Sequence, residues 1–267
     1  MHLHANGIDI DIEYVLEGPE DAPVVTFSHS LGSSMALWNA QAYLLKDRFR
    51  VLRYDNRGHG GTEVTPPPYS FEQFAEDACA LLRALEIERT HFVGLSNGGM
   101  IGQTLALAHP EVIRTLVLCD TTSRPPDPTI PVWEERAVTV LSEGMEPIVP
   151  TTIERWFSPE VRERNPALVA RFSDLIRSTA PEAYAACCRA IQRVDLTDCL
   201  HAIKVPTLLL VGSEDTGTVV EEHEIIRDRI AGAELVVIEG AAHLSNLCAP
   251  EKFNLELSSF LDRHADA

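Results

Sequence analysis

The sequence alternates between short apolar strand patterns and amphipathic helical patterns, and this alternation restricts the fold more than any other feature. Apolar runs typical of buried strands occupy residues 24–28, 50–54, 91–95 and 112–119, and helical patterns separate them. A strand, a helix and a further strand form the repeating unit of proteins with parallel sheets. The sequence therefore predicts an α/β fold, with a mainly parallel sheet that is flanked by helices.

Local signals support individual elements of this pattern. Residues 1–16 are predicted to form a hairpin, because Asn6-Gly7 is a favoured tight-turn pair and residues 8–12 alternate between apolar and acidic side chains. Ser70 is followed three residues later by Gln73, and this spacing is typical of a capped helix start. We therefore expect a helix that begins just after Ser70.

The alternation is interrupted once, and the interruption predicts the domain organisation. Residues 124–128 read Arg-Pro-Pro-Asp-Pro, a sequence that breaks regular structure. The following residues, up to about 200, have helical patterns and no convincing strand, and the strand pattern then returns at residue 205. We expect a core made of two segments, 1–121 and 203–267, with a helical cap at 122–202.

The strongest chemical signal is the run Gly94-Leu95-Ser96-Asn97-Gly98-Gly99, which follows a strand pattern and opens a helical one. A serine in a sharp strand-to-helix turn projects its hydroxyl above the sheet, and glycines two residues to either side avoid a clash. The helix start also directs free N–H groups toward the same place. Ser96 is therefore predicted to be a nucleophile.

A serine hydroxyl needs a base to become a good nucleophile, and two later strand ends offer the partners. His243 follows the strand pattern at 234–238, and Asp215 follows the strand pattern at 205–211. The chain order Ser96, Asp215, His243 is the nucleophile, acid and base order of a known catalytic triad. Asp120, which ends another strand pattern, is an alternative for the acid.

Composition limits the kinds of partner. The 267 residues include 40 Asp and Glu against 22 Lys and Arg, a formal charge of −18 that disfavours nucleic acid and anionic membrane surfaces. The sequence has no apolar run long enough for a membrane span, no secretion signal and no zinc-binding pattern, and its six cysteines form no Cys-x-x-Cys pair. These features predict a cytoplasmic protein that acts on a small molecule, and they leave open whether it is a monomer or a homo-oligomer. The expected serine, histidine and aspartate chemistry needs no metal or organic cofactor.

Nearly the whole chain resembles the α/β-hydrolase superfamily. The motifs are His29-Ser30-Leu31-Gly32 after a strand, DNRGHG at 55–60, the Ser96 turn and the loops of Asp215 and His243. The resemblance implies an α/β-hydrolase fold with an inserted helical cap. It also implies an oxyanion hole formed by the backbone N–H groups of Leu31 and Asn97, although Ser30 stands where the superfamily usually has glycine.

Within the superfamily, the chain is most similar to the 3-oxoadipate enol-lactonases, which open a five-membered enol lactone in aromatic catabolism through the β-ketoadipate pathway. The similar stretches include SHSLGSSMALWNAQ, GLSNGGMIGQ, ERWF and AHLSN. The resemblance implies that Trp133, Arg136 and Trp156 are cap residues that contact substrate, and an arginine could bind the carboxylate of the lactone. Trp38 could line the pocket or pack in the core. His29 is expected to order the loop beside the oxyanion hole and is a candidate for substrate contact.

These observations predict a serine hydrolase that opens a small lactone or ester through an acyl-enzyme. Two alternatives stay open at this point. One is a general carboxylesterase or C–C bond hydrolase of the same fold. The other is a hydrolase homologue that binds a ligand without turnover, against which the complete triad argues.

Overall fold

A computed structural model describes residues 2–4 and 10–265 of the chain, and its centre is a mixed sheet. The sheet has eight described strands in the order β1-β2-β4-β3-β5-β6-β7-β8. Every neighbouring pair from β4 to β8 runs parallel, whereas β1 with β2 and β2 with β4 run antiparallel. The strands are β1 (His2–His4), β2 (Asp11–Glu17), β3 (Val24–Ser28), β4 (Arg50–Tyr54), β5 (Thr90–Leu95), β6 (Ile113–Cys119), β7 (Thr207–Gly212) and β8 (Glu234–Ile238).

The antiparallel edge agrees with the predicted hairpin. His2 pairs with Glu13, and His4 pairs with Asp11. The proposed Asn6-Gly7 turn lies outside the described residues. The central strands β3, β5 and β7 are buried along their whole length, as expected for strands with helices on both faces.

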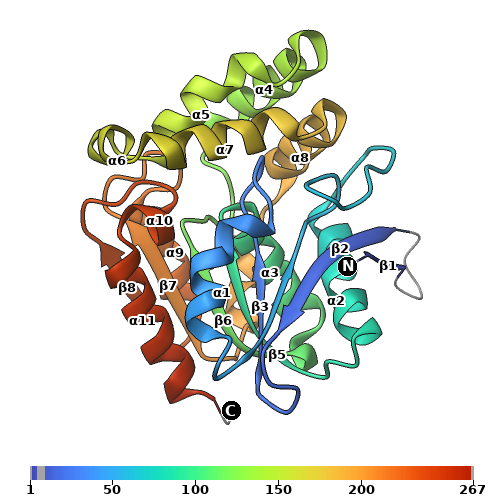
Figure 1. The fold of residues 1–267 in the computed structure, drawn as a ribbon, viewed down its shortest axis with the longest axis vertical. Helices are drawn as coiled ribbons and strands as arrows, with labels where there is room; N and C mark the ends of the chain where they lie inside the picture. The colour runs from blue at the N-terminus through green and yellow to red at the C-terminus, as the bar shows by residue number, and fades with distance from the viewer. Residues whose placement is uncertain (1, 5–9, 266–267) are drawn as a thin grey trace.

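Helices cover both faces of the sheet (Figure 1). Helices α1 and α11 share one face, where Gln41 of α1 donates a hydrogen bond to Asn254 of α11. Helices α2, α3 and α9 cover the other face. Ser70 caps α2 by accepting a hydrogen bond from the N–H of Gln73, as the sequence predicts. The flanking helices are α1 (Asn39–Leu45), α2 (Phe71–Ala84), α3 (Asn97–Ala108), α9 (Val220–Arg229), α10 (Ser245–Cys248) and α11 (Pro250–Arg263).

The segment between β6 and β7 consists of helices and connecting loops and lies over one end of the sheet (Figure 1). Because β6 ends where this segment begins, the end that it covers is the carboxyl end of the parallel strands. Helices α4 and α8 pack closely against each other within it. We call this segment the cap, and its helices are α4 (Ile130–Glu143), α5 (Val149–Trp156), α6 (Pro159–Arg164), α7 (Pro166–Ser178) and α8 (Pro181–Arg193).

The fold is the α/β-hydrolase architecture that the sequence predicts, and the division into segments 1–121, 122–202 and 203–267 stays a prediction. In the described part of the chain, no helix is both long enough and apolar enough to cross a membrane. Loops at the carboxyl ends of β3, β5, β6, β7 and β8 lie beneath the cap. Residues distant in sequence therefore meet at this edge.

Candidate active site

Ser96 sits in a strained turn between β5 and α3. Its backbone has φ +56° and ψ −114°, a conformation that costs a non-glycine residue about 1–3 kcal/mol. The flanking glycines allow the turn. A Cβ atom at Gly94 would lie 2.1 Å from the carbonyl oxygen of Gly98, and one at Gly98 would lie 2.3 Å from that of Ser28. Such local strain is typical of a functional position.

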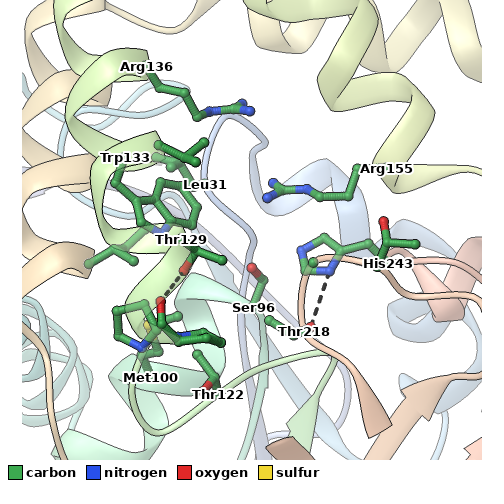
Figure 2. Close-up of a pocket in the computed structure, with 16 residues that line it drawn as sticks. Leu31, Ser96, Met100, Thr122, Thr129, Trp133, Arg136, Arg155, Thr218 and His243 are labelled. Carbon is green, nitrogen blue, oxygen red and sulfur yellow. Dashed lines mark hydrogen bonds between the residues drawn. The ribbon is translucent and has the colours of Figure 1, made fainter.

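His243 lies in the loop between β8 and α10 and is almost completely buried. Its Nδ1 is 2.7 Å from Oδ2 of Asp215. Its Nε2 is also buried and has no hydrogen-bond partner among the described residues. Ser96 and His243 line the same cavity, and Figure 2 shows the hydroxyl and the ring projecting into it. The free ring nitrogen is thus available for a group in the cavity.

Asp215 is held as a carboxylate by several donors. Oδ1 accepts hydrogen bonds from the N–H groups of Gly217 (2.8 Å) and Thr218 (3.1 Å), and Oδ2 accepts one from the Thr218 hydroxyl (2.6 Å). Burial disfavours the charged form, but the adjacent His243 and these donors outweigh it, so the pKa of Asp215 lies below its usual range. The carboxylate therefore stays ionised beside the imidazole.

Asp120, the alternative acid, has different partners. Its Oδ1 accepts a hydrogen bond from the N–H of Gly212 (2.9 Å), and its Oδ2 accepts one from the hydroxyl of Ser245 (2.5 Å). Complete burial, together with the charge of Asp215, raises the pKa of Asp120 well above its usual range. The structure thus brings Asp215, and not Asp120, to His243.

The two residues expected to form the oxyanion hole, Leu31 and Asn97, each have a backbone N–H without a hydrogen-bond acceptor in the described part of the chain. Asn97 is the first residue of α3, where a helix leaves its N–H without an intrahelical acceptor. Leu31 lines the cavity, and its N–H donates no hydrogen bond within the described residues. The adjacent Gly32 N–H donates to Nε2 of His59 (3.1 Å), which anchors this loop.

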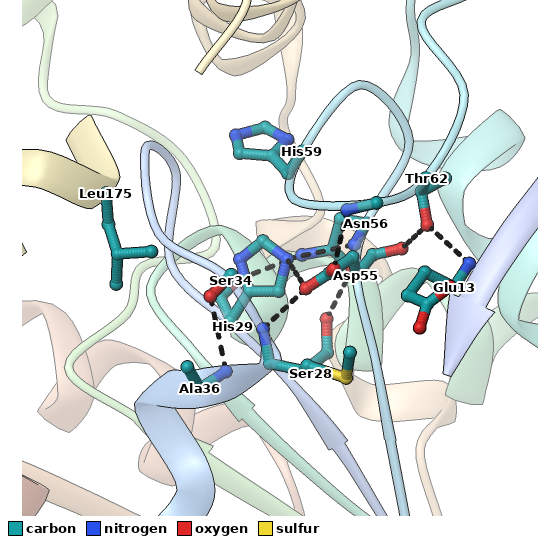
Figure 3. Close-up of polar contacts among 12 residues, drawn as sticks. Glu13, Ser28, His29, Ser34, Ala36, Asp55, Asn56, His59, Thr62 and Leu175 are labelled. Atoms are coloured by element: carbon teal, nitrogen blue, oxygen red, sulfur yellow. Dashed lines mark hydrogen bonds and ion pairs between the residues drawn. The ribbon is translucent and has the colours of Figure 1, made fainter. Parts of the chain in front are cut away.

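His29 belongs to a buried polar network behind that loop, as Figure 3 shows. Its Nδ1 contacts the carbonyl oxygen of Ser30 at 2.8 Å, and its Nε2 accepts a hydrogen bond from the N–H of Asn56 at 2.9 Å. Burial lowers the pKa of His29 to about 4, so the ring is neutral. The structure does not place His29 among the residues that line the cavity.

Trp38 is also absent from the residues that line the cavity, and it lies in the core, one of the two positions predicted for it. Its side chain is fully buried and packs against Phe27, with ring centroids 4.8 Å apart. The indole N–H donates a hydrogen bond to the carbonyl oxygen of Ser28 (3.1 Å). The large indole therefore fills the core beneath α1 and cannot reach a ligand.

The cavity has a volume of about 220 Å³ and lies between the strand ends and the cap. We call Ser96, His243 and Asp215 the floor group, in which Ser96 and His243 line the cavity and Asp215 contacts His243 from outside it. We call Trp133, Arg136 and Arg155, which also line the cavity, the cap group. Most of the remaining wall is apolar, which suits a small organic ligand. Its other lining residues are Leu31, Met100, Thr122, Pro125, Pro126, Thr129, Val132, Ile191, Thr216, Gly217 and Thr218.

Two arginines of the cap face this cavity (Figure 2). Arg136 Nη2 donates to the hydroxyls of Thr152 (2.7 Å) and Tyr184 (2.6 Å). Arg155 Nε is buried and has no hydrogen-bond partner among the described residues. Both guanidinium groups lie 5.9 Å from the centre of the Trp133 ring. The described part of the chain pairs neither arginine with a carboxylate.

Arg155 is a residue that the sequence interpretation missed. Burial, and then the nearby charge of Arg136, lower the pKa of Arg155. Arg155 lies in the ERWF stretch, and its neighbour Trp156 was the residue expected to touch substrate. Trp156 instead is fully buried and packs on Phe172, with centroids 6.0 Å apart. A helical wheel for α5 could have shown that both side chains do not face the same way.

No group of three or more His, Cys, Asp or Glu side chains within residues 2–4 and 10–265 could hold a metal ion. The site is therefore described by its serine, histidine and aspartate, its two free backbone N–H groups and its arginines.

The fold and the site define the class of protein. Residues 23–250 match the family model of the alpha/beta hydrolase fold, so the chain belongs to the α/β-hydrolase family.

Among its relatives, the chain is similar to 3-oxoadipate enol-lactonase 2 of Acinetobacter baylyi, with 33% identity over 96% of this chain and 94% of that one. The crystal structure of the enol-lactonase from Burkholderia xenovorans LB400 superposes with a TM-score of 0.94, at 36% identity over 98% of this chain and 100% of that one. The RutD protein of Pseudomonas syringae, whose name gives carbamate hydrolysis as a provisional activity, is 30% identical over 90% of this chain and 94% of its own. The predicted similarity to the enol-lactonases is confirmed.

Proposed function

We propose that this protein is a serine hydrolase that opens a small lactone bearing a carboxylate, with 3-oxoadipate enol-lactone as the leading candidate. One observation carries the proposal. A serine in a strained turn shares a cavity with a buried imidazole, whose Nδ1 faces an ionised aspartate and whose Nε2 is free. The similarity to two enol-lactonases supports the choice of substrate.

Ser96 is the proposed nucleophile and His243 the proposed base. Nε2 of His243 takes the proton as the Ser96 oxygen attacks the lactone carbonyl carbon. The negative charge that develops on the carbonyl oxygen is stabilised by the N–H groups of Leu31 and Asn97, and one such donor is typically worth ~3 kcal/mol. Collapse of the tetrahedral intermediate breaks the bond to the ring oxygen, which leaves as an enolate. The proton held by His243 passes to this enolate as it ketonises, which returns the imidazole to its basic form.

Water completes the cycle. His243 removes a proton from the water molecule, the resulting hydroxide attacks the acyl-enzyme, and Ser96 leaves with the proton that His243 returns. Asp215 accepts a hydrogen bond from Nδ1–H in this scheme, which presents Nε2 in its basic form and stabilises the imidazolium. All of these steps use side chains and amides of this chain, with no cofactor.

The cap group supplies the proposed preference for an anionic substrate. The chain has a formal charge of −18, yet two guanidinium groups face the cavity without a carboxylate partner. Both arginines are half-buried, so water solvates their charges poorly, and a substrate carboxylate would satisfy them with charge-assisted hydrogen bonds. Arg155, whose Nε has no acceptor among the residues that the structure describes, is the stronger candidate, and Arg136 and Trp133 complete the subsite.

The proposed setting is the cytoplasm. All six cysteines are unpaired, and five of them are buried, which fits a reducing compartment. The expected partner is the small substrate alone.

The test is a set of progress curves for the wild type with the enol lactone, neutral p-nitrophenyl esters and a small carbamate. We expect the highest kcat/KM for the anionic lactone, and Ser96→Ala, with its fold intact by circular dichroism, serves as the blank. Turnover of neutral esters without the lactone would instead indicate a general esterase. Preferred turnover of the carbamate would instead indicate a carbamate hydrolase. Ligand-induced stabilisation without any turnover would indicate a binding protein.

A further inference from the structure

The end of β6 contacts every loop that carries a residue of the floor group. The carbonyl oxygen of Cys119 accepts a hydrogen bond from the N–H of Ser96 (2.8 Å). The hydroxyl of Thr121 donates to the carbonyl oxygen of Ser96 (2.7 Å). The backbone of the serine is therefore held on both sides by the residues that flank Asp120.

Asp120 itself joins the other two loops. Its Oδ1 accepts a hydrogen bond from Gly212, which is three residues before Asp215. Its Oδ2 accepts hydrogen bonds from both the N–H (3.3 Å) and the hydroxyl (2.5 Å) of Ser245, which is two residues after His243. One fully buried carboxylate thus ties the loop of the acid to the loop of the base.

This arrangement is costly, which argues against an incidental core contact. Asp120 has a positive φ of 43°, and its carboxyl is completely buried with no cation among its contacts. Carboxylates are rarely buried in this way without a compensating role. Thr121, the next residue, also donates its N–H to the ring of His223 (2.9 Å), so the backbone here is fixed at several points.

We propose that Asp120 is a positioning residue, which rests on the proposed function: it holds the imidazole of His243 in line between Asp215 and Ser96. It does not contact the substrate or the reacting atoms. Without this carboxylate, the loop of His243 would lose the acceptor for two donors of Ser245. A displacement of about 1 Å at a reacting group can lower the rate about 100-fold.

The kinetic test compares three variants. Asp120→Asn keeps the size of the side chain but replaces one acceptor with an N–H₂ group, and Ser245→Ala removes only the hydroxyl donor. Thr115→Val is the matched control, because Thr115 lies in β6, the strand that ends just before Asp120, is fully buried, hydrogen-bonds His91 (2.9 Å) and does not line the cavity. We expect kcat to fall about 10- to 100-fold in Asp120→Asn with KM unchanged, to fall less in Ser245→Ala, and to stay at the wild-type value in Thr115→Val.

A second measurement does not depend on activity. The downfield proton signal of His243 Nδ1–H, assigned by its absence in His243→Gln, reports the hydrogen bond to Asp215 by NMR. We expect this signal to shift or broaden in Asp120→Asn and Ser245→Ala and to persist in Thr115→Val. If the wild type proves inactive or Ser96→Ala retains turnover, the proposed function fails, but the signal still tests Asp120.

The proposal is overturned if Asp120→Asn keeps both the wild-type signal and the wild-type kcat. It is also overturned if Thr115→Val changes the signal as much as Asp120→Asn does, because the change would then result from any buried substitution near this strand and not from the contacts of Asp120. If Asp120→Asn does not fold, Ser245→Ala decides, and an unchanged signal and kcat in that variant count against the proposal.

Discussion

The floor and the cap of the cavity differ in how completely their polar groups are satisfied by the protein. In the floor group, the carboxylate of Asp215 has donors on both oxygens and the loop beside it is anchored by hydrogen bonds. In the cap group, Arg155 Nε has no hydrogen-bond partner within residues 2–4 and 10–265, and Arg136 donates to the hydroxyls of Thr152 and Tyr184. The charged group of the floor, Asp215, thus has its partners before a ligand arrives, whereas the cap arginines lack an anion.

This difference separates two aspects of the proposed activity. A preorganised floor supplies the chemistry, which is common to many esters and lactones. A cap with unsatisfied positive charge supplies selectivity, because only an anionic substrate completes it. Changes in the floor should therefore lower kcat for every substrate, and changes in the cap should raise KM for anionic substrates alone.

The largest loss of activity, and so the strongest test of the role of the floor group, is expected from Asp215→Asn. An amide at this position cannot stabilise the imidazolium and favours the wrong ring tautomer, so kcat should fall roughly 10³-fold or more for anionic and neutral substrates alike. Steady-state kinetics with both substrate classes measure this. A smaller loss in Asp215→Asn than in Asp120→Asn would move the acid role to Asp120.

A smaller and more selective effect is expected from Arg155→Met. Loss of a hydrogen bond to a charged group is typically worth about 1.5–3 kcal/mol, so KM for the anionic lactone should rise about 10- to 100-fold. The values for a neutral ester should not change, and Arg136→Met should have the weaker effect because Tyr184 and Thr152 remain. Arg171→Met, an exposed cap residue outside the cavity, controls for the change in net charge. Equal losses on both substrate classes would refute a carboxylate subsite.

The two buried aspartates, Asp215 and Asp120, should change the free energy of unfolding in opposite directions as the pH rises. The pKa of Asp215 is lowered in the folded state, so its contribution is present above the unfolded value of about 3.9 and is lost as the pH falls through the lower folded value. The pKa of Asp120 is raised, so the wild type loses stability as the pH rises from about 3.9 toward the raised value.

Urea unfolding across this pH range measures both contributions. Asp215→Asn should be less stable than the wild type near neutral pH, and this difference should disappear in acid. Asp120→Asn should become more stable relative to the wild type as the pH rises toward neutral. Parallel pH curves for the wild type and both variants would contradict the assigned pKa directions.

The smallest effect is expected from Trp38→Phe, which tests the boundary of the cavity. The variant loses one buried hydrogen bond to Ser28, worth about 0.5–1.5 kcal/mol, so the free energy of unfolding should fall by about that amount or slightly more. The kinetic constants should stay at their wild-type values. A substrate-dependent change in KM would instead indicate that Trp38 contacts the substrate.

The sequence was informative where function depends on chain order and local geometry. The turn at Ser96 is a local structure with its own glycine requirement, and strand ends place His243 and Asp215 at one edge of a parallel sheet. For that reason the fold and the contact between His243 and Asp215 could be predicted from spacing and motif.

The cap could not be predicted in the same way, because its helices meet through side-chain packing. Only the packing of α5 decides that Arg155 faces the cavity while Trp156 fills the interior. The position of Trp38 likewise follows from its contact with Phe27, which no local pattern reveals. The partners of Asp120 lie 92 and 125 residues away, and so its hydrogen bonds are visible only in the folded chain.

The most direct test of the central claim is to trap the acyl-enzyme. The wild type is mixed with excess enol lactone, quenched in acid within the first turnover, digested and analysed by mass spectrometry. Ring opening leaves both ends of the lactone in one molecule, so the peptide that contains Ser96 should gain the mass of the intact lactone. Lactone consumption that leaves this peptide unmodified, or modifies another residue instead, would contradict the account.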